Sequence, residues 1–288
     1  GNGTIEDLRQ ADGSIYNPLE IFPGGFTPRF EGDVEDVSAA GGIRGNLSET
    51  TTFDVSLRYG SNEIDYRLFN TINPSLGPAT PTDFRPGTLT NEELQFQVDL
   101  VTEFDAGLAS PLVFAYGVSY LDETYDVGQS SQPESYLAGP HAVADPFGLC
   151  NSDGTPTAAG MAATNAPVDE PLDCANPDAP VFTVVGVGSN GFPGYSPEFS
   201  EEYTRDSYAV YGDLSADVTD RLLLQGALRF EDYSDFGNEL GGKVAARYRI
   251  NDSFALRGSV GTGFRAPTPG QHGTTNVSTR LPNGFPVA

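Results

Sequence analysis

The stretch from Tyr203 to Pro267 constrains the fold more than any other, because its side chains alternate in character with a period of two. Successive side chains of a β-strand point to opposite faces of a sheet. The alternation puts one set of side chains on an apolar face and a second set on a polar face: Leu222, Leu224, Leu228 and Phe230, against Gln225, Arg229 and Glu231. Residues 243–250 and 253–264 repeat the pattern. This stretch therefore predicts consecutive strand pairs joined by tight turns.

The same alternation recurs upstream and predicts about eight strands in all. The earlier strands are expected over 35–47, 53–68, 94–104 and 112–120. Two fold classes fit the alternation by itself. A soluble β-sandwich buries its apolar face against a second sheet, whereas a membrane β-barrel turns that face towards lipid.

The order of the connections favours the barrel. Short turns follow the first, third, fifth and seventh strands, whereas long Pro-rich connections, 69–91 and 128–202, follow the second and fourth. An up-and-down meander with short turns at one rim and long loops at the other is typical of outer-membrane barrels, while sandwiches place long loops at both ends. The sequence therefore predicts an all-β, antiparallel, up-and-down transmembrane barrel, here a partial one of about eight strands.

Side chains along the strands support this choice. Aromatic residues stand near both ends of the apolar stretches, as in the two interfacial girdles of membrane barrels: Phe53, Phe104 and Phe254 at one end, and Tyr120, Phe230 and Phe264 at the other. Charged residues such as Arg58, Glu103 and Lys243 occur in mid-strand on the opposite face. Burying them in a sandwich core would be costly, but a hydrated lumen would accommodate them.

Composition excludes several other classes. No apolar run approaches the roughly 20 residues that a transmembrane helix needs, and only 155–166 suggests a short helix. The formal net charge is −25, and the arginines are dispersed. A nucleic-acid partner is not expected, because phosphate binding needs clustered Lys and Arg.

The chain has two cysteines, Cys150 and Cys174, both in the long connection over 128–202. In an oxidising compartment a disulfide is the natural pairing, and it would stabilise the fold by about 3 kcal/mol in the chain-entropy model. Two free thiols are the alternative. The chain starts without Met and stops just after a loop-like stretch, so we expect an internal fragment.

Specific residues add a family resemblance to this pattern. The run from Arg229 to Gly237 and the segment from Leu256 to Pro267 resemble the barrel of bacterial TonB-dependent receptors. The most characteristic part is a five-residue motif: Gly263, Phe264, Arg265, Ala266 and Pro267. The stretches 22–28 and 70–77 also look like parts of that family, and the cysteine-bearing loop is the least covered.

The resemblance implies an outer-membrane barrel of twenty-two strands with an N-terminal plug inside, which imports a scarce nutrient in an energy-coupled way. Residues 1–288 would then be part of one receptor barrel domain, with 128–202 as a long extracellular loop. The implied partners are outer-membrane lipid, the protein's own plug, the inner-membrane TonB complex reached through that plug, and a nutrient such as a ferric siderophore, cobalamin or carbohydrate. The sequence shows neither a plug nor a TonB-contacting segment.

The sequence offers no enzymatic site, cofactor or metal centre. The glycines around Thr262 lack the Gly-Lys-Ser/Thr continuation of a phosphate loop, and we expect the motif to be structural, with Pro267 ending the strand ladder. His141 and His272 stand far apart in loops. No nucleophile and base occur in a recognisable arrangement. Two non-enzymatic alternatives to the importer remain open: a passive outer-membrane porin and a secreted β-domain that binds carbohydrate.

Overall fold

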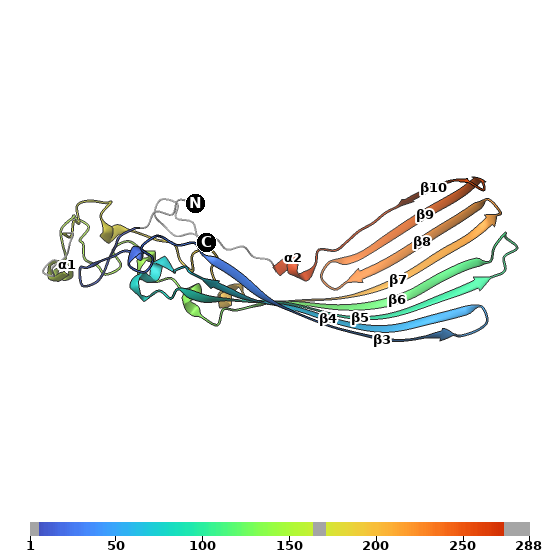
Figure 1. Ribbon diagram of the computed structural model, residues 1–288, viewed down its shortest axis with the longest axis horizontal. Helices are drawn as coiled ribbons and strands as arrows, with labels where there is room; N and C mark the ends of the chain where they lie inside the picture. The colour runs from blue at the N-terminus through green and yellow to red at the C-terminus, as the bar shows by residue number, and fades with distance from the viewer. Residues whose placement is uncertain (1–5, 164–170, 274–288) are drawn as a thin grey trace.

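The main body of the protein is one eight-stranded antiparallel sheet, in which each strand pairs with its neighbours in sequence (Figure 1). The computed structural model describes residues 6–163 and 171–273. The strands of this sheet are β3 (Arg29–Asn46), β4 (Thr51–Phe69), β5 (Asp83–Phe104), β6 (Leu112–Gly128), β7 (Glu202–Thr219), β8 (Leu222–Tyr233), β9 (Gly237–Asn251) and β10 (Phe254–Gly261). The predicted eight-stranded meander is therefore confirmed. The sheet is open, with β3 and β10 at its edges.

Small elements make up the rest. Two short strands, β1 (Leu8–Arg9) and β2 (Ile15–Tyr16), form a separate pair, and the α-helices are α1 (Ala158–Ala163) and α2 (Pro269–Gly273). Short 3₁₀ segments are η1 (Pro18–Glu20), η2 (Pro74–Ala79), η3 (Pro133–Ser135), η4 (Pro140–Ala142), η5 (Pro180–Phe182) and η6 (Pro197–Phe199). The helix expected over 155–166 is present as α1, and 164–166 lie outside the described residues. Within the described residues, no helix has the length and apolar character needed to cross a membrane.

An apolar band runs across one face of the sheet and is not covered by a second layer. Leu228 is 62% exposed and Val244 is 66% exposed, so these side chains do not belong to a compact core. The band extends from Leu94 to Phe104 on β5 and from Leu222 to Phe230 on β8. These lengths match the roughly 9–11 residues with which a tilted strand crosses a bilayer core. The two-layer sandwich is therefore excluded, and the fold is a partial transmembrane barrel.

The polarity of the two faces inverts part of the way along β4. Up to Tyr59 the apolar side chains lie on the face of the band, and from Ile64 onwards they lie on the opposite face. Pairing with β3 runs without a break through this point, so the backbone keeps its register. The inverted section contacts the loops: Leu68 is 1% exposed, and the Tyr66 ring lies 5.8 Å from that of Phe192. The strands thus continue beyond the membrane band to support a folded region.

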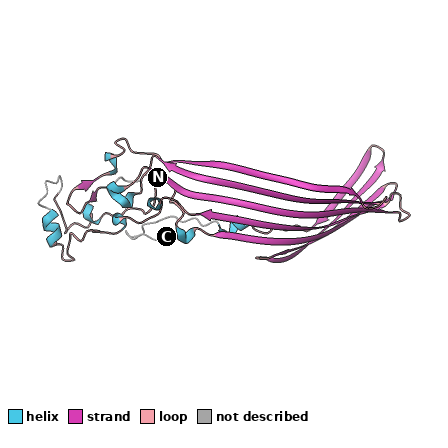
Figure 2. Cartoon of the chain, turned by 90° about the horizontal axis from the view of Figure 1, so that it is seen from below, coloured by secondary structure: helices cyan, strands magenta, loops and turns pink. Residues whose placement is uncertain are grey.

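The connections differ in length between the two ends of the sheet. We call the end with the connections 47–50, 105–111, 220–221 and 252–253 the turn rim, and the opposite end the loop rim. Residues 6–28, 70–82 and 129–201, as far as they are described, form the loop region at the loop rim (Figure 2). The long connection expected over 69–91 is in part wrong, because β5 begins at Asp83. The pairing of β5 with β4 continues on both sides of Pro86, and the register shifts at this point.

Candidate functional site

The polar face of the sheet carries an ordered row of side chains at the level of the band. The Tyr211 hydroxyl on β7 donates to Asp99 Oδ1 on β5 at 2.5 Å, and the Gln97 side-chain amide donates to Asp99 Oδ2 at 2.7 Å. Gly117 on β6 lies between Asp99 and Tyr211, and a Cβ atom at this position would lie 2.7 Å from the Tyr211 ring. The glycine therefore lets two strands that are not neighbours share a hydrogen bond.

Beside this row the polar face holds a cavity of about 530 Å³. It lies over β7, β8 and β9, where Gly241 presents no side chain opposite Arg229. The residues that give it its chemistry are Tyr211, Asp213, Arg229, Glu231, Glu239, Lys243, Thr262 and Phe264. A volume of this size falls within the range of small-molecule sites.

The charges in the cavity are mixed and partly paired. Arg229 Nε donates to Glu231 Oε1 at 2.9 Å, and the Tyr233 hydroxyl donates to Glu231 Oε2 at 2.9 Å. The Asp213 carboxylate accepts from the Gln225 side-chain amide at 2.7 Å. Glu231 is thus held in hydrogen bonds on both oxygens. Among the described residues no three His, Cys, Asp or Glu side chains gather as metal ligands would. The paired charges of both signs suit a polar solute or a polar protein surface.

The motif from Gly263 to Pro267 lies partly inside this site. The ladder ends before the motif, with the Thr262 N–H donating to the Gly242 carbonyl at 2.8 Å, and not at Pro267 as expected. Phe264 lines the cavity and stacks on Phe236 with ring centroids 5.1 Å apart. Phe264 therefore does not join the aromatic girdle on the apolar face, which corrects the expectation. His272 lies in α2, beyond the motif.

A buried ion pair nearer the loop rim escaped the sequence analysis. Arg205 on β7 faces Glu123 on β6, and its Nε and Nη2 both donate to Glu123 Oε2, at 3.0 and 2.5 Å. The side chains are only 4% and 9% exposed. Arg205 Nη1 donates to the Pro267 carbonyl, and the guanidinium lies 5.3 Å from the Tyr233 ring centroid. No local pattern reveals this group, because strand register brings it together.

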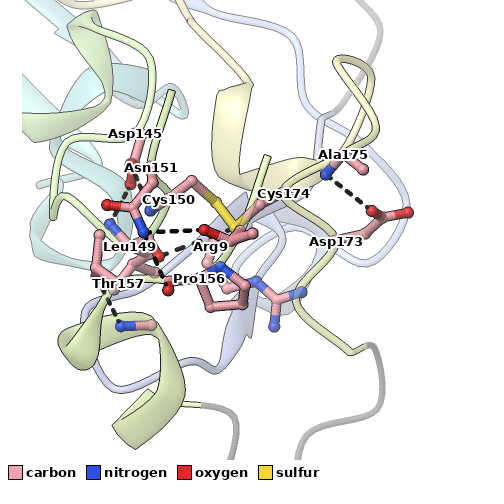
Figure 3. Close-up of a disulfide and its surroundings, with 12 residues drawn as sticks. Arg9, Asp145, Leu149, Cys150, Asn151, Pro156, Thr157, Asp173, Cys174 and Ala175 are labelled. Atoms are coloured by element: carbon pink, nitrogen blue, oxygen red, sulfur yellow. Dashed lines mark hydrogen bonds between the residues drawn. A yellow bond between two sulfur atoms is a disulfide. The ribbon is translucent and has the colours of Figure 1, made fainter. Parts of the chain in front are cut away.

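The loop region has a small core of its own near the disulfide. Cys150 and Cys174 are joined, with Cα atoms 5.4 Å apart (Figure 3). Leu149 and Val181 are buried beside them, together with Ala163 and Ala179. The Asp145 carboxylate accepts from the N–H groups of Leu149 and Cys150 at 2.7 and 2.9 Å. Val181 thus packs within the loop region itself, in the cluster beside the disulfide.

Asn73, which is fully buried, joins the β4–β5 connection to the long connection between β6 and β7. Its side-chain amide donates to the carbonyls of Glu134 and Leu137 at 2.8 and 2.9 Å, and its Oδ1 accepts from the Ser75 hydroxyl at 2.7 Å. One asparagine therefore connects two loops that are distant in sequence. Sequence reasoning had singled out 70–77 only as a stretch similar to the family.

His141 is the third feature of the loop region. It is buried, its Nε2 lies 3.2 Å from the Gln10 side-chain nitrogen, and its ring meets the Phe147 ring edge-on at 5.7 Å. Burial lowers the pKa of this imidazole, so the neutral form accepts the hydrogen bond from Gln10. Burial likewise raises the pKa of the nearby loop residue Tyr195 to about 12. Both groups are packing elements.

Comparisons with known proteins agree with this architecture. Residues 5–285 match the family described as TonB dependent receptor-like, beta-barrel. Solved structures similar to the chain include a double mutant of the ferric enterobactin receptor PfeA from Pseudomonas aeruginosa, with TM-score 0.44 and 11% identity over 84% of this chain and 26% of that receptor. The siderophore receptors PirA from Pseudomonas aeruginosa and from Acinetobacter baumannii both have TM-score 0.39 and 13% identity, over 85% and 88% of this chain and 38% of each receptor.

The chain thus spans between 26% and 38% of the length of these receptors. A comparison with curated proteins found no match. The family match covers nearly the whole chain and coincides with the open eight-stranded sheet and its apolar band. The chain therefore belongs to the TonB-dependent receptor family, in its β-barrel domain.

Proposed function

We propose that this chain forms part of the wall and outer loops of an outer-membrane importer that takes up a scarce nutrient with energy from the TonB complex. The observation that carries the proposal is the two-faced sheet. Its apolar band is of membrane-spanning length, and its opposite face carries charged side chains and is hollowed by a cavity of about 530 Å³. Membership of the receptor family supports the energy-coupled mode.

In this proposal each part has a role. The apolar band contacts outer-membrane lipid, and the polar face lines a lumen shared by the protein's own plug and the passing nutrient. The loop region, including 128–202, faces the outside and gives the first contact to a ferric siderophore, cobalamin or carbohydrate. Its internal core and disulfide keep this surface in one shape, which lowers the ordering cost of binding.

Uptake by the complete protein tests the proposal. The protein is expressed in a Gram-negative strain that lacks its own siderophore importers, and uptake of radioactive ferric siderophores is measured with and without a functional TonB complex. We expect uptake that requires both the protein and TonB. Uptake that continues without TonB would instead indicate the passive porin. If no siderophore is imported, cobalamin and oligosaccharides are tested in the same way.

Orientation is tested separately on intact cells with a membrane-impermeant thiol reagent. Leu137→Cys places a thiol in the loop region, where the native side chain is about half exposed, and Asp252→Cys places one at the turn rim. The native cysteines are paired in the disulfide. We expect labelling at 137 and protection at 252, and the reverse pattern would overturn the proposed orientation.

A further inference from the structure

The segment that follows β10 runs along the polar face towards the loop rim, past the β8–β9 turn. β10 ends at Gly261, yet the Pro267 carbonyl reaches Arg205 on β7, and α2 packs against β6 and β7 (Figure 1). Through Lys243 and Ala227, Gly261 lies opposite Asp213 on β7, and Arg205 stands eight residues further along β7 towards the loop rim. The segment therefore runs more along the strands than across them. We call residues 262–267 the strap.

The strap is held at both ends by contacts that meet each other. At its start, the Thr262 hydroxyl accepts from the Gly242 N–H at 3.0 Å, and Phe264 stacks on Phe236. At its end, Arg205 holds the Pro267 carbonyl. Phe236 in turn meets the Tyr233 ring, which lies under the Arg205 guanidinium. The contacts of the strap with Phe236 and with Arg205 are therefore linked to each other through Tyr233 at the end of β8.

The same contacts border the cavity on the polar face. Thr262, Gly263 and Phe264 line one side of it, so the strap supplies part of its wall. Tyr233, which touches Arg205, also holds the Glu231 carboxylate inside the cavity. Access along this part of the polar face consequently depends on where the strap lies.

From this geometry we infer that Arg205 is a positioning residue, and that its bonds to Glu123 and to the Pro267 carbonyl hold the strap at the loop-rim edge of the cavity and limit the entry of solutes from that side. A guanidinium suits this role because its planar set of donors can serve a carboxylate and a carbonyl at once. Because the pair is buried, losing one partner is costly, since the other charge is then left uncompensated. The importance of the strap for import rests on the proposed function, but its effect on access does not.

The test measures access to the cavity directly. Ala227→Cys introduces a thiol in the cavity wall on β8 with little change in size, and its labelling rate by a charged thiol reagent is measured on the complete protein in outer-membrane vesicles. The bonds of Arg205 to Glu123 and to the strap are removed in the double variant Arg205→Leu with Glu123→Met, which we call the latch variant. Exchanging both partners for apolar residues avoids an isolated buried charge, which a single Arg205→Ala change would leave.

Three controls make the result specific. Arg247→Ala removes an arginine from the same face whose ion pair with Asp217, at 3.4 Å, is exposed and does not involve the strap. A reporter thiol at Ser215, away from the strap, reports general loosening. Heat-modifiable gel mobility shows that each variant keeps a folded barrel.

We expect the latch variant to raise labelling at 227 by about tenfold, because a tenfold change in the open fraction needs a bias of only about 1.4 kcal/mol. Labelling at 215, and labelling at 227 in Arg247→Ala, should stay within about twofold, since exposed ion pairs contribute little. An unchanged rate at 227 in the folded latch variant would overturn the inference, as would an equal rise in the Arg247→Ala control. Absence of nutrient uptake by the unmodified protein would refute the proposed function and leave the labelling result valid.

Discussion

The sheet and the loop region are stabilised in opposite ways. In the sheet the backbone ladder is nearly continuous, while large apolar side chains such as Val244 remain exposed on one face. In the loop region regular structure is scarce, but Asn73, His141 and the disulfide lie buried in contacts that the region makes with itself. The sheet therefore depends on its surroundings, lipid on one face and water on the other, and the loop region depends on its own packing.

The largest effect should come from placing a charge in the apolar band. Val244→Arg on β9 is expected to lower the free energy of unfolding by about 2–4 kcal/mol in a bilayer, the cost of an arginine near the midplane on the lipid face of a barrel. Its sequence neighbour Ala245→Arg points to the polar face and should cost far less. Urea unfolding of the complete protein in lipid vesicles measures both. Equal costs at the two positions would show that the faces have been assigned wrongly.

Breaking the disulfide should destabilise the loop region and leave the sheet unchanged. Cys150→Ser with Cys174→Ser is expected to cost about 3 kcal/mol of local stability, the chain-entropy value for a loop of this size. Amide hydrogen exchange should show faster exchange around Leu149 and Val181, with β8 and β9 unchanged. If exchange rose equally in the strands, the loop region would not be an independent unit.

A smaller, pH-dependent effect should come from His141. Its folded-state pKa is lowered by burial, whereas the unfolded imidazole titrates near 6.5. The unfolded state then binds more protons, so this contribution is complete above about pH 6.5 and is lost as the pH falls through that value. Hydrogen-exchange protection factors in the loop region, corrected for the intrinsic pH dependence of exchange, should therefore fall as the pH is lowered from about 7.5 to 5. His141→Gln should flatten this dependence, and an unaltered profile in that variant would assign the effect to another group.

Much of the sheet could be predicted from the sequence because strand periodicity is a local signal. Leu222 to Tyr233 alternates along most of its length, and the structure places a strand there. The start of β5 was missed, because Pro86 and Gly87 resemble a loop although pairing resumes on both sides of them.

The candidate site was much less predictable. Glu123 and its partner Arg205 lie on strands that a long connection separates, and only the register brings them together. Asn73 likewise gains its role from carbonyls more than sixty positions away. The motif from Gly263 to Pro267 was recognised by its residues, but the bond that its Pro267 carbonyl accepts comes from Arg205, on a strand far away in sequence.

The inversion along β4 has a consequence for how such a chain can change. Because a strand has a period of two, deleting one residue within Phe53 to Tyr59 would exchange the faces of one section relative to the other. It would bring Arg58 to the lipid, or Glu63 and Asp65 to the interior beneath the loops. Lineages that vary the length of this strand should therefore do so in steps of two residues, or at the bulge near Tyr66, where the ladder already absorbs a shift.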